Sequence, residues 1–190
     1  MNDIRNYLTS VAALLHEVSS REVDNAITLL WENYQGGRRA VFCGNGGSAA
    51  TASHLPADLQ KNMYLSGGRP WEVLSLTDSV PLLTAWSNDT GYINVFAGQV
   101  RTWLRTGDLL VAISGSGDSP NILAAVEAAH ELGAVTLGLS GFGGGKLAAL
   151  AQNNIIIPSH NMQMVEDTHM VIGHLIFSVL RERLQEIRAS

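Results

Sequence analysis

Two pairs of ionisable side chains have a spacing that suits metal binding or proton transfer. His54 and Asp58 are four residues apart, so on a helix they share one face and could bind one metal ion or act as acid and base. Glu166 and His174 are eight residues apart, which is about 80° around a helix axis. A single histidine on an apolar helix is more often a packing residue, but two such pairs together predict a site.

Two turns rich in glycine and serine could hold a phosphate group. Residues 44–48 read GNGGS and residues 114–119 read SGSGDS, and each stretch lies between a short apolar run and a helix-like segment. Exposed backbone N–H groups and a helix N-terminus attract an anion, and serine hydroxyls suit phosphate oxygens. Either turn alone could be a simple connection, but the two together predict a phosphate site. The first turn contributes Asn45, Gly46, Gly47 and Ser48 as candidate ligand contacts.

Two other motifs of nucleotide-binding type fit the sequence less well. Residues 44–49 match a dinucleotide fingerprint, but the nearest acid after the second predicted strand is Asp78, which is too far along the chain for the usual ribose contact. Residues 141–146, GFGGGK, resemble a phosphate loop, yet Ser140 replaces its first glycine and Leu147 its Ser/Thr. We interpret this stretch as a turn.

The chain starts with a pattern that predicts two helices. Apolar residues recur every three or four positions from residue 2 to 18, and a second apolar stripe follows until Gly36 and Gly37. Ser19 and Glu22 predict a capping box at the start of the second helix. With no obvious sheet to cover, both helices are expected to pack against another subunit.

From residue 38 onward, short apolar runs alternate with helix-like segments, which favours a parallel sheet covered by helices on both faces. If the first and third strands are neighbours, as in a 2-1-3-4-5 order, both glycine turns flank the crevice of the sheet. Pro56 should kink the helix that carries His54. The expected strands are 40–43, 72–76, 109–114, 135–139 and 154–158, and the expected helices are 48–61, 92–104, 120–132 and 162–187.

Composition narrows the functional classes. With 190 residues the chain fits one domain over 1–190, made of N-terminal helices (1–37) and an α/β core (38–190). The net charge of -5 and the lack of a basic run argue against nucleic acid as a partner. No signal peptide or membrane-spanning segment is expected. The single cysteine, Cys43, is compatible with a reducing cytoplasm, which is the predicted location.

Four stretches, CGNGGSAATASH, SNDTG, ISGSGDSPNILAAVEAA and VEDTHMVIGH, resemble the SIS-domain sugar isomerases, closest to the phosphoheptose isomerases. The resemblance implies a five-stranded parallel α/β sandwich that assembles as a homotetramer, with active sites between subunits. It implies that a sugar phosphate is the substrate and that His54 and His174 belong to a metal site. It also assigns substrate contacts to Asn88 and Asp89, and phosphate contacts to Ser48, Ser114, Ser116 and Ser119.

The chain departs from the family pattern at four positions. Asp58 replaces the catalytic Glu, Pro56 an Ala, Glu166 a metal-binding Gln and Asn62 an Arg. Carboxylates and imidazoles bind zinc well, so His54, Asp58, Glu166 and His174 are the predicted ligands, with Glu166 also near the substrate.

The predicted function is an aldose–ketose isomerase for sedoheptulose 7-phosphate, with Asp58 as base, His174 as acid and zinc polarising the carbonyl. Two alternatives remain open. One is an isomerase of a different sugar phosphate, because the substitutions around Asp58 could suit another sugar. The other is a non-catalytic SIS protein that senses a sugar phosphate or binds a protein partner, because the catalytic Glu of the family is absent.

Overall fold

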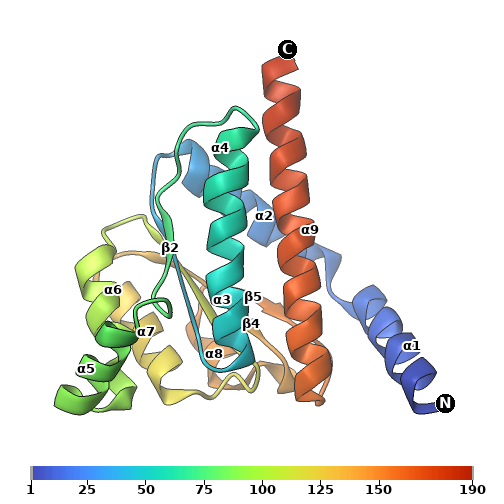
Figure 1. The fold of residues 1–190 in the computed structure, drawn as a ribbon, viewed down its shortest axis with the longest axis horizontal. Helices are drawn as coiled ribbons and strands as arrows, with labels where there is room; N and C mark the ends of the chain where they lie inside the picture. The colour runs from blue at the N-terminus through green and yellow to red at the C-terminus, as the bar shows by residue number, and fades with distance from the viewer. Residues whose placement is uncertain (1, 190) are drawn as a thin grey trace.

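The computed structural model describes residues 2–189, and its centre is a parallel sheet of five strands (Figure 1). The strand order is β2-β1-β3-β4-β5, which confirms the predicted order. Because β1 and β3 are neighbours, with Gly44 opposite Ile113, the turns that follow these two strands lie side by side. The strands are β1 (Ala40–Gly44), β2 (Val73–Ser75), β3 (Leu109–Ser114), β4 (Val135–Ser140) and β5 (Asn153–Ile156).

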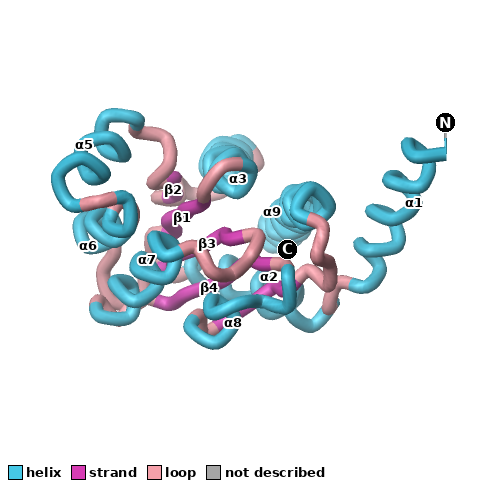
Figure 2. Tube along the Cα trace, turned by 90° about the horizontal axis from the view of Figure 1, so that it is seen from below, coloured by secondary structure: helices cyan, strands magenta, loops and turns pink. Residues whose placement is uncertain are grey.

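Helices cover both faces of this sheet (Figure 2). Phe42 and Val111 point into one apolar cluster, with α2, α3 and α9, whereas Val41 and Leu110 point into the other, with α6, α7 and α8. Burial on both faces explains why the strands read as continuous apolar runs. None of the helices within residues 2–189 combines the length and apolar character that crossing a bilayer requires. The helices are α1 (Asn2–Glu17), α2 (Ser20–Gln35), α3 (Gly47–Ala57), η1 (Asp58–Asn62), α4 (Met63–Leu65), α5 (Val80–Thr90), η2 (Tyr92–Asn94), α6 (Ala97–Trp103), α7 (Pro120–Glu131), η3 (Phe142–Gly144), α8 (Gly145–Leu150) and α9 (Met162–Ala189).

The second helix, α2, has a different partner from the one predicted. Its apolar residues, including Ile27 and Leu30, are buried against the sheet rather than left for another subunit. The Ser19 hydroxyl accepts from the Glu22 N–H, as a capping box requires, but the Glu22 carboxylate accepts from the Ile156 N–H on β5 at 3.0 Å. Half of the predicted capping box is therefore replaced by a bond that attaches α2 to the edge strand.

The first helix, α1, projects from the body of the molecule (Figure 1). Leu14 is buried, but Ile4 and Leu8 are 68% and 63% exposed. Near its middle, the Tyr7 hydroxyl donates to the Asp167 carboxylate of α9 at 2.6 Å. An apolar face on α1 is thus open in the single chain, as an oligomerisation helix would require.

The helix after β1 continues through three segments, α3, η1 and α4, which form one column beside α9 (Figure 1). Pro56, predicted to kink this helix, lies inside α3, and the backbone widens into a π-helix from Asp58 to Asn62. A proline has no N–H to donate to the preceding turn, so a wider turn just after it is a reasonable local adjustment. Helix α5, in contrast, was missed by the prediction. None of its residues is fully buried, and two residues, Leu83 and Trp86, pack against the apolar cluster on the face with α6 and α7, so its apolar stripe is short.

His169 connects α9 to the last residue of β4, Ser140. Its side chain is 1% exposed, and its Nε2 atom lies 3.3 Å from the carbonyl oxygen of Ser140. Burial disfavours the charged imidazolium and lowers the pKa of His169 from 6.5 to about 4.

Acidification from pH 6.5 to 4 should therefore destabilise the fold. In this window the unfolded chain protonates at position 169 and the folded chain does not, so the free energy of unfolding should fall by roughly 3 kcal/mol as the pH drops. Urea unfolding at several pH values measures this slope. The His169→Gln variant should flatten it, and the exposed His16→Gln variant should keep it; an unchanged slope in His169→Gln would contradict the assignment.

Candidate active site

The two glycine–serine turns line one cavity of about 240 Å³ at the carboxyl ends of β1 and β3. Ligands bind at this edge of open α/β sheets. The cavity brings together most of the residues predicted to bind a phosphate. Its lining consists of Asn45, Gly46, Gly47, Ser48, Ile113, Ser114, Gly115, Ser116, Ser119, Met162 and Glu166. We call this cavity the cradle.

Two helix N-termini meet at the cradle. Helix α3 begins at Gly47, directly after Gly46, whose φ of 55° favours glycine. Helix α7 begins at Pro120, with Ser119 as its N-cap residue. The Ser114 hydroxyl donates to the Ser119 hydroxyl at 3.0 Å, which fixes both oxygens at the wall. Helix dipoles, backbone N–H groups and hydroxyls all favour an anion here.

The GFGGGK stretch, residues 141–146, supports the second turn from behind. The Gly141 N–H donates to the carbonyl of Gly115 at 2.8 Å, and the Leu147 N–H donates to that of Gly117 at 2.9 Å. A Cβ atom on Gly117 would collide with the backbone of Gly144, so the two turns pack backbone against backbone. The stretch is a supporting turn, as predicted, and does not line the cradle.

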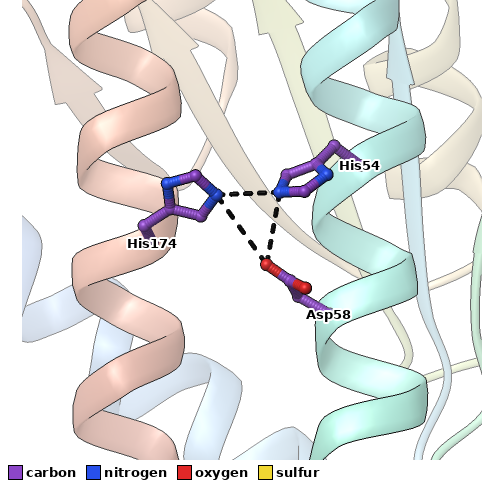
Figure 3. Close-up of side chains that lie close together, drawn as sticks. All are labelled: His54, Asp58 and His174. Carbon is purple, nitrogen blue, oxygen red and sulfur yellow. Dashed lines mark hydrogen bonds and ion pairs between the residues drawn. The ribbon is translucent and has the colours of Figure 1, made fainter.

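A second group of functional side chains lies on the seam between α3 and α9. His54, Asp58 and His174 point toward one another from the two helices (Figure 3). The Nε2 atoms of the two histidines are 2.8 Å apart, and the Asp58 Oδ2 atom is 3.3 Å from His54 and 3.8 Å from His174. The histidines are exposed and Asp58 is half-buried, so the group is open to a ligand.

The donor set suits a divalent metal ion. Zinc bound tetrahedrally at about 2.0–2.1 Å places neighbouring ligand atoms roughly 3.3 Å apart. The three separations, 2.8, 3.3 and 3.8 Å, surround that value. Three protein ligands would leave one tetrahedral position for water or substrate, as in catalytic zinc sites.

Asn62 orients the carboxylate of this group. Its side-chain amide donates to Asp58 Oδ1 at 3.1 Å, leaving Oδ2 to face the histidines. Both residues belong to the π-helical turn, a feature often found at functional sites. The position that holds Arg in the family pattern thus supplies a hydrogen bond to the carboxylate.

Glu166, predicted as a fourth ligand, lies apart from the group whose ligand atoms are within 4.8 Å of one another. Its carboxylate packs against Gly47 at the cradle, where a Cβ atom would collide with it. The eight residues from Glu166 to His174 correspond to about 12 Å along a helix axis. The predicted angle of about 80° would let Glu166 and His174 face one crevice, but the rise of about 12 Å along α9 keeps their side chains apart.

Asn88 and Asp89 lie in the last turn of α5, where the Asn88 amide donates to the Asp89 carboxylate. Both are exposed, and neither lines the cradle or joins the metal-binding group. The same corner of the chain reaches the cradle through Tyr92, whose hydroxyl donates to Asn45 Oδ1 at 2.8 Å. Sequence reasoning missed Tyr92 and also Asn121, which pairs with Asn45. The position of Asn121, a polar residue in the first turn of α7, was the available signal.

The sequence and the fold of this chain are similar to those of known proteins. Residues 6–141 match the family described as SIS domain. A phosphoheptose isomerase from Rhodospirillum rubrum is 40% identical over 162 residues, 85% of this chain and 86% of that protein, and one from Akkermansia muciniphila is 35% identical over 95% and 96%. The solved phosphoheptose isomerase from Neisseria gonorrhoeae superposes with a TM-score of 0.87 at 29% identity, covering 94% of this chain and 97% of that one. Given this extent of identity, the chain belongs to the phosphoheptose isomerase family of SIS-domain proteins, which are sugar-phosphate isomerases.

Proposed function

We propose that the protein interconverts sedoheptulose 7-phosphate and the corresponding aldose, a heptose 7-phosphate. The substrate follows the names of its relatives, which are phosphoheptose isomerases. The observation that supports the proposal most directly is the arrangement along the seam of α3 and α9. Seven residues of helix, about 10 Å, separate Gly47 at the cradle from His54 in the metal-binding group. A sugar phosphate with its phosphate at one end and its carbonyl at the other suits this spacing.

Each side chain of the group has a role in this reaction. Asp58 removes the proton from the carbon next to the carbonyl and returns it to the adjacent carbon, since its remaining lone pairs can take a proton while Asn62 holds Oδ1. His174 moves protons between the two oxygens of the enediol through its Nδ1 atom, because its Nε2 atom is the one that faces His54 and Asp58. His54, Asp58 and His174 would hold a divalent ion, proposed to be zinc, which when bound would polarise the carbonyl. The cradle anchors the phosphate and fixes the reacting carbons in place.

We further propose that the protein is a cytoplasmic homotetramer. The open apolar face of α1 and the exposed Val171 and Leu175 of α9, 42% and 46% exposed, support burial against other copies of the chain. Cys43 is a buried free thiol, which is compatible with a reducing cytoplasm. Burial raises the pKa of this thiol to about 12, so it stays protonated and unreactive.

Substitution of Asp58 and His174 should abolish proton exchange. Asp58→Asn and His174→Ala should each lower turnover at least about 100-fold, since a positioned acid or base contributes that much. The measurement is deuterium incorporation from solvent at the carbon next to the carbonyl, with ketose phosphates of five to seven carbons. The exposed Glu127→Gln and His160→Ala variants serve as controls and should keep full activity.

The panel of sugars also separates the alternatives. If deuterium is incorporated only into a shorter sugar phosphate, that sugar phosphate is the substrate instead of the heptose phosphate. No exchange with any member, while the chain still binds the sugar phosphates, would favour a non-catalytic sensor and overturn the proposal.

Zinc binding should depend on the two histidines and on the residue that orients Asp58. Titration of the metal-free protein with zinc should give one ion per chain, lost in His54→Ala and in His174→Ala. Asn62→Ala should weaken zinc binding about 10-fold, the usual effect of losing a hydrogen bond to a ligand. The His160→Ala control should bind zinc like the parent; equal zinc binding by His54→Ala would refute the assignment.

Glu166→Gln distinguishes a cradle residue from a zinc ligand. The lining residues of the cradle include one carboxylate, Glu166, and no lysine or arginine. Removing a negative charge beside a bound phosphate should tighten inorganic phosphate binding about fivefold, with zinc stoichiometry unchanged. The neighbouring Asp167→Asn variant, whose carboxylate accepts from Tyr7, is the matched control and should change neither property. Loss of zinc in Glu166→Gln would show instead that Glu166 is a ligand.

A further inference from the structure

Three segments that are distant in the sequence meet at the side chain of Asn45. Asn45 lies in the first turn of the cradle, Asn121 in the first turn of α7, and Tyr92 in η2, just after α5. The Asn45 amide donates to Asn121 Oδ1, and the Asn121 amide donates back to Asn45 Oδ1, each at 2.9 Å. The Tyr92 hydroxyl donates to the same Asn45 oxygen at 2.8 Å.

The bonds can be counted against what an amide can make. An asparagine side chain has two N–H donors and an oxygen with two lone pairs. Both lone pairs of the Asn45 oxygen are used, by Asn121 and Tyr92, and one of its N–H donors is used by Asn121. One N–H donor remains. Because Asn45 lines the cradle, this donor is available to a bound ligand, which must then present an acceptor.

Burial makes the pairing with Asn121 strong. Asn121 is 3% exposed, so its amide has little access to water and would lose its partner if Asn45 turned away. Leaving a buried polar group without a hydrogen bond destabilises the arrangement that leaves it so. Tyr92, in contrast, is 55% exposed and closes the network from the solvent side.

We propose that Asn121 and Tyr92 are positioning residues that hold the Asn45 amide with its free N–H turned into the cradle, where it donates to a phosphate oxygen of the substrate. The inference rests on the proposed function in that the ligand is a sugar phosphate. It gives the SNDTGY corner, residues 87–92, a structural role: the Tyr92 hydroxyl connects this corner to the turn that receives the phosphate.

A double-mutant cycle tests whether Asn121 acts through Asn45. The probes are inorganic phosphate and sedoheptulose 7-phosphate, with dissociation constants measured by calorimetry. Asn45→Ala and Asn121→Ala should each weaken binding about 10-fold, and the double variant should bind no more weakly than Asn45→Ala alone, because residues in one network are not additive. Additive losses would overturn the inference.

Tyr92→Phe provides a test that keeps the core intact. It removes the hydroxyl from an exposed ring, so the fold should persist, and phosphate binding should weaken about threefold in the parent and not at all in the Asn45→Ala background. The matched control is Asn94→Ala, because the Asn94 amide in the same corner donates to the Thr90 carbonyl and does not touch Asn45. Weaker binding by Asn94→Ala, or by Tyr92→Phe in both backgrounds, would show a general effect on the corner and refute the role.

Kinetics separate this role from catalysis. In the isomerase reaction, Asn121→Ala and Tyr92→Phe should raise KM with kcat unchanged, since the phosphate end is remote from the proton transfer. If the cycle shows coupling but no sugar is turned over, the proposed function fails and the positioning role stands. If turnover is normal and the cycle is additive, the positioning role alone fails. A parent chain that binds neither probe would overturn both.

Discussion

The close parallel contact between the helical column of residues 47–65 and helix α9 determines the geometry of the whole site. Glycine permits this contact at two points: a Cβ on Gly47 would collide with Glu166, and a Cβ on Gly173 would collide with Leu55. At the far end, the Arg188 side chain donates to the Ser66 carbonyl at 2.8 Å. Because the two helices stay in contact over this length, the Nε2 atoms of His54 and His174 come within 2.8 Å of each other. A helix pair held further apart would separate the metal-binding group.

The order of strands supplies the second constraint. Pairing of β1 with β3 brings two turns that are about 70 residues apart in the chain to the same edge of the sheet, and both open into helices. The cradle is therefore built from backbone N–H groups, helix N-termini and hydroxyls, without a lysine or arginine among the residues that line it. Its single carboxylate, Glu166, works against an anion. Binding must then depend on the number and direction of hydrogen bonds, which is why fixed donors such as Asn45 matter here.

Local patterns predicted most of the fold because apolar periodicity and turn chemistry act within a few residues. The five strands and the helices at 20–35, 120–131 and 162–189 carry such signals. The strand order carries no local signal; it was predicted as the 2-1-3-4-5 arrangement of open α/β sheets and is confirmed. Helix α5 carries a weak signal, since two of its residues, Leu83 and Trp86, pack against the core and neither is fully buried. Spacing along the chain predicted the pairing of His54 with Asp58, whereas the meeting of His54 with His174 was predicted through the family resemblance. The position of Glu166 depends on the rise along α9 and on its packing against Gly47, and the pairing of Asn45 with Asn121 depends on tertiary structure.

The π-helical turn links the departures at Pro56, Asp58 and Asn62 into one local structure. Pro56 cannot donate to the preceding turn, and the helix widens from Asp58 to Asn62. Asp58 is shorter than the Glu of the family pattern by one methylene, so its reach depends on where the backbone places it. Within this turn the Asp58 Oδ2 atom comes within 4 Å of both histidines while Asn62 holds Oδ1. The Asp58 N–H still donates to the His54 carbonyl, as in a regular α-helix, so His54 and Asp58 keep their i, i+4 relation and the widening lies beyond that bond. What the wide turn places is Asn62, whose amide holds Oδ1 of Asp58 and leaves Oδ2 at the histidine pair.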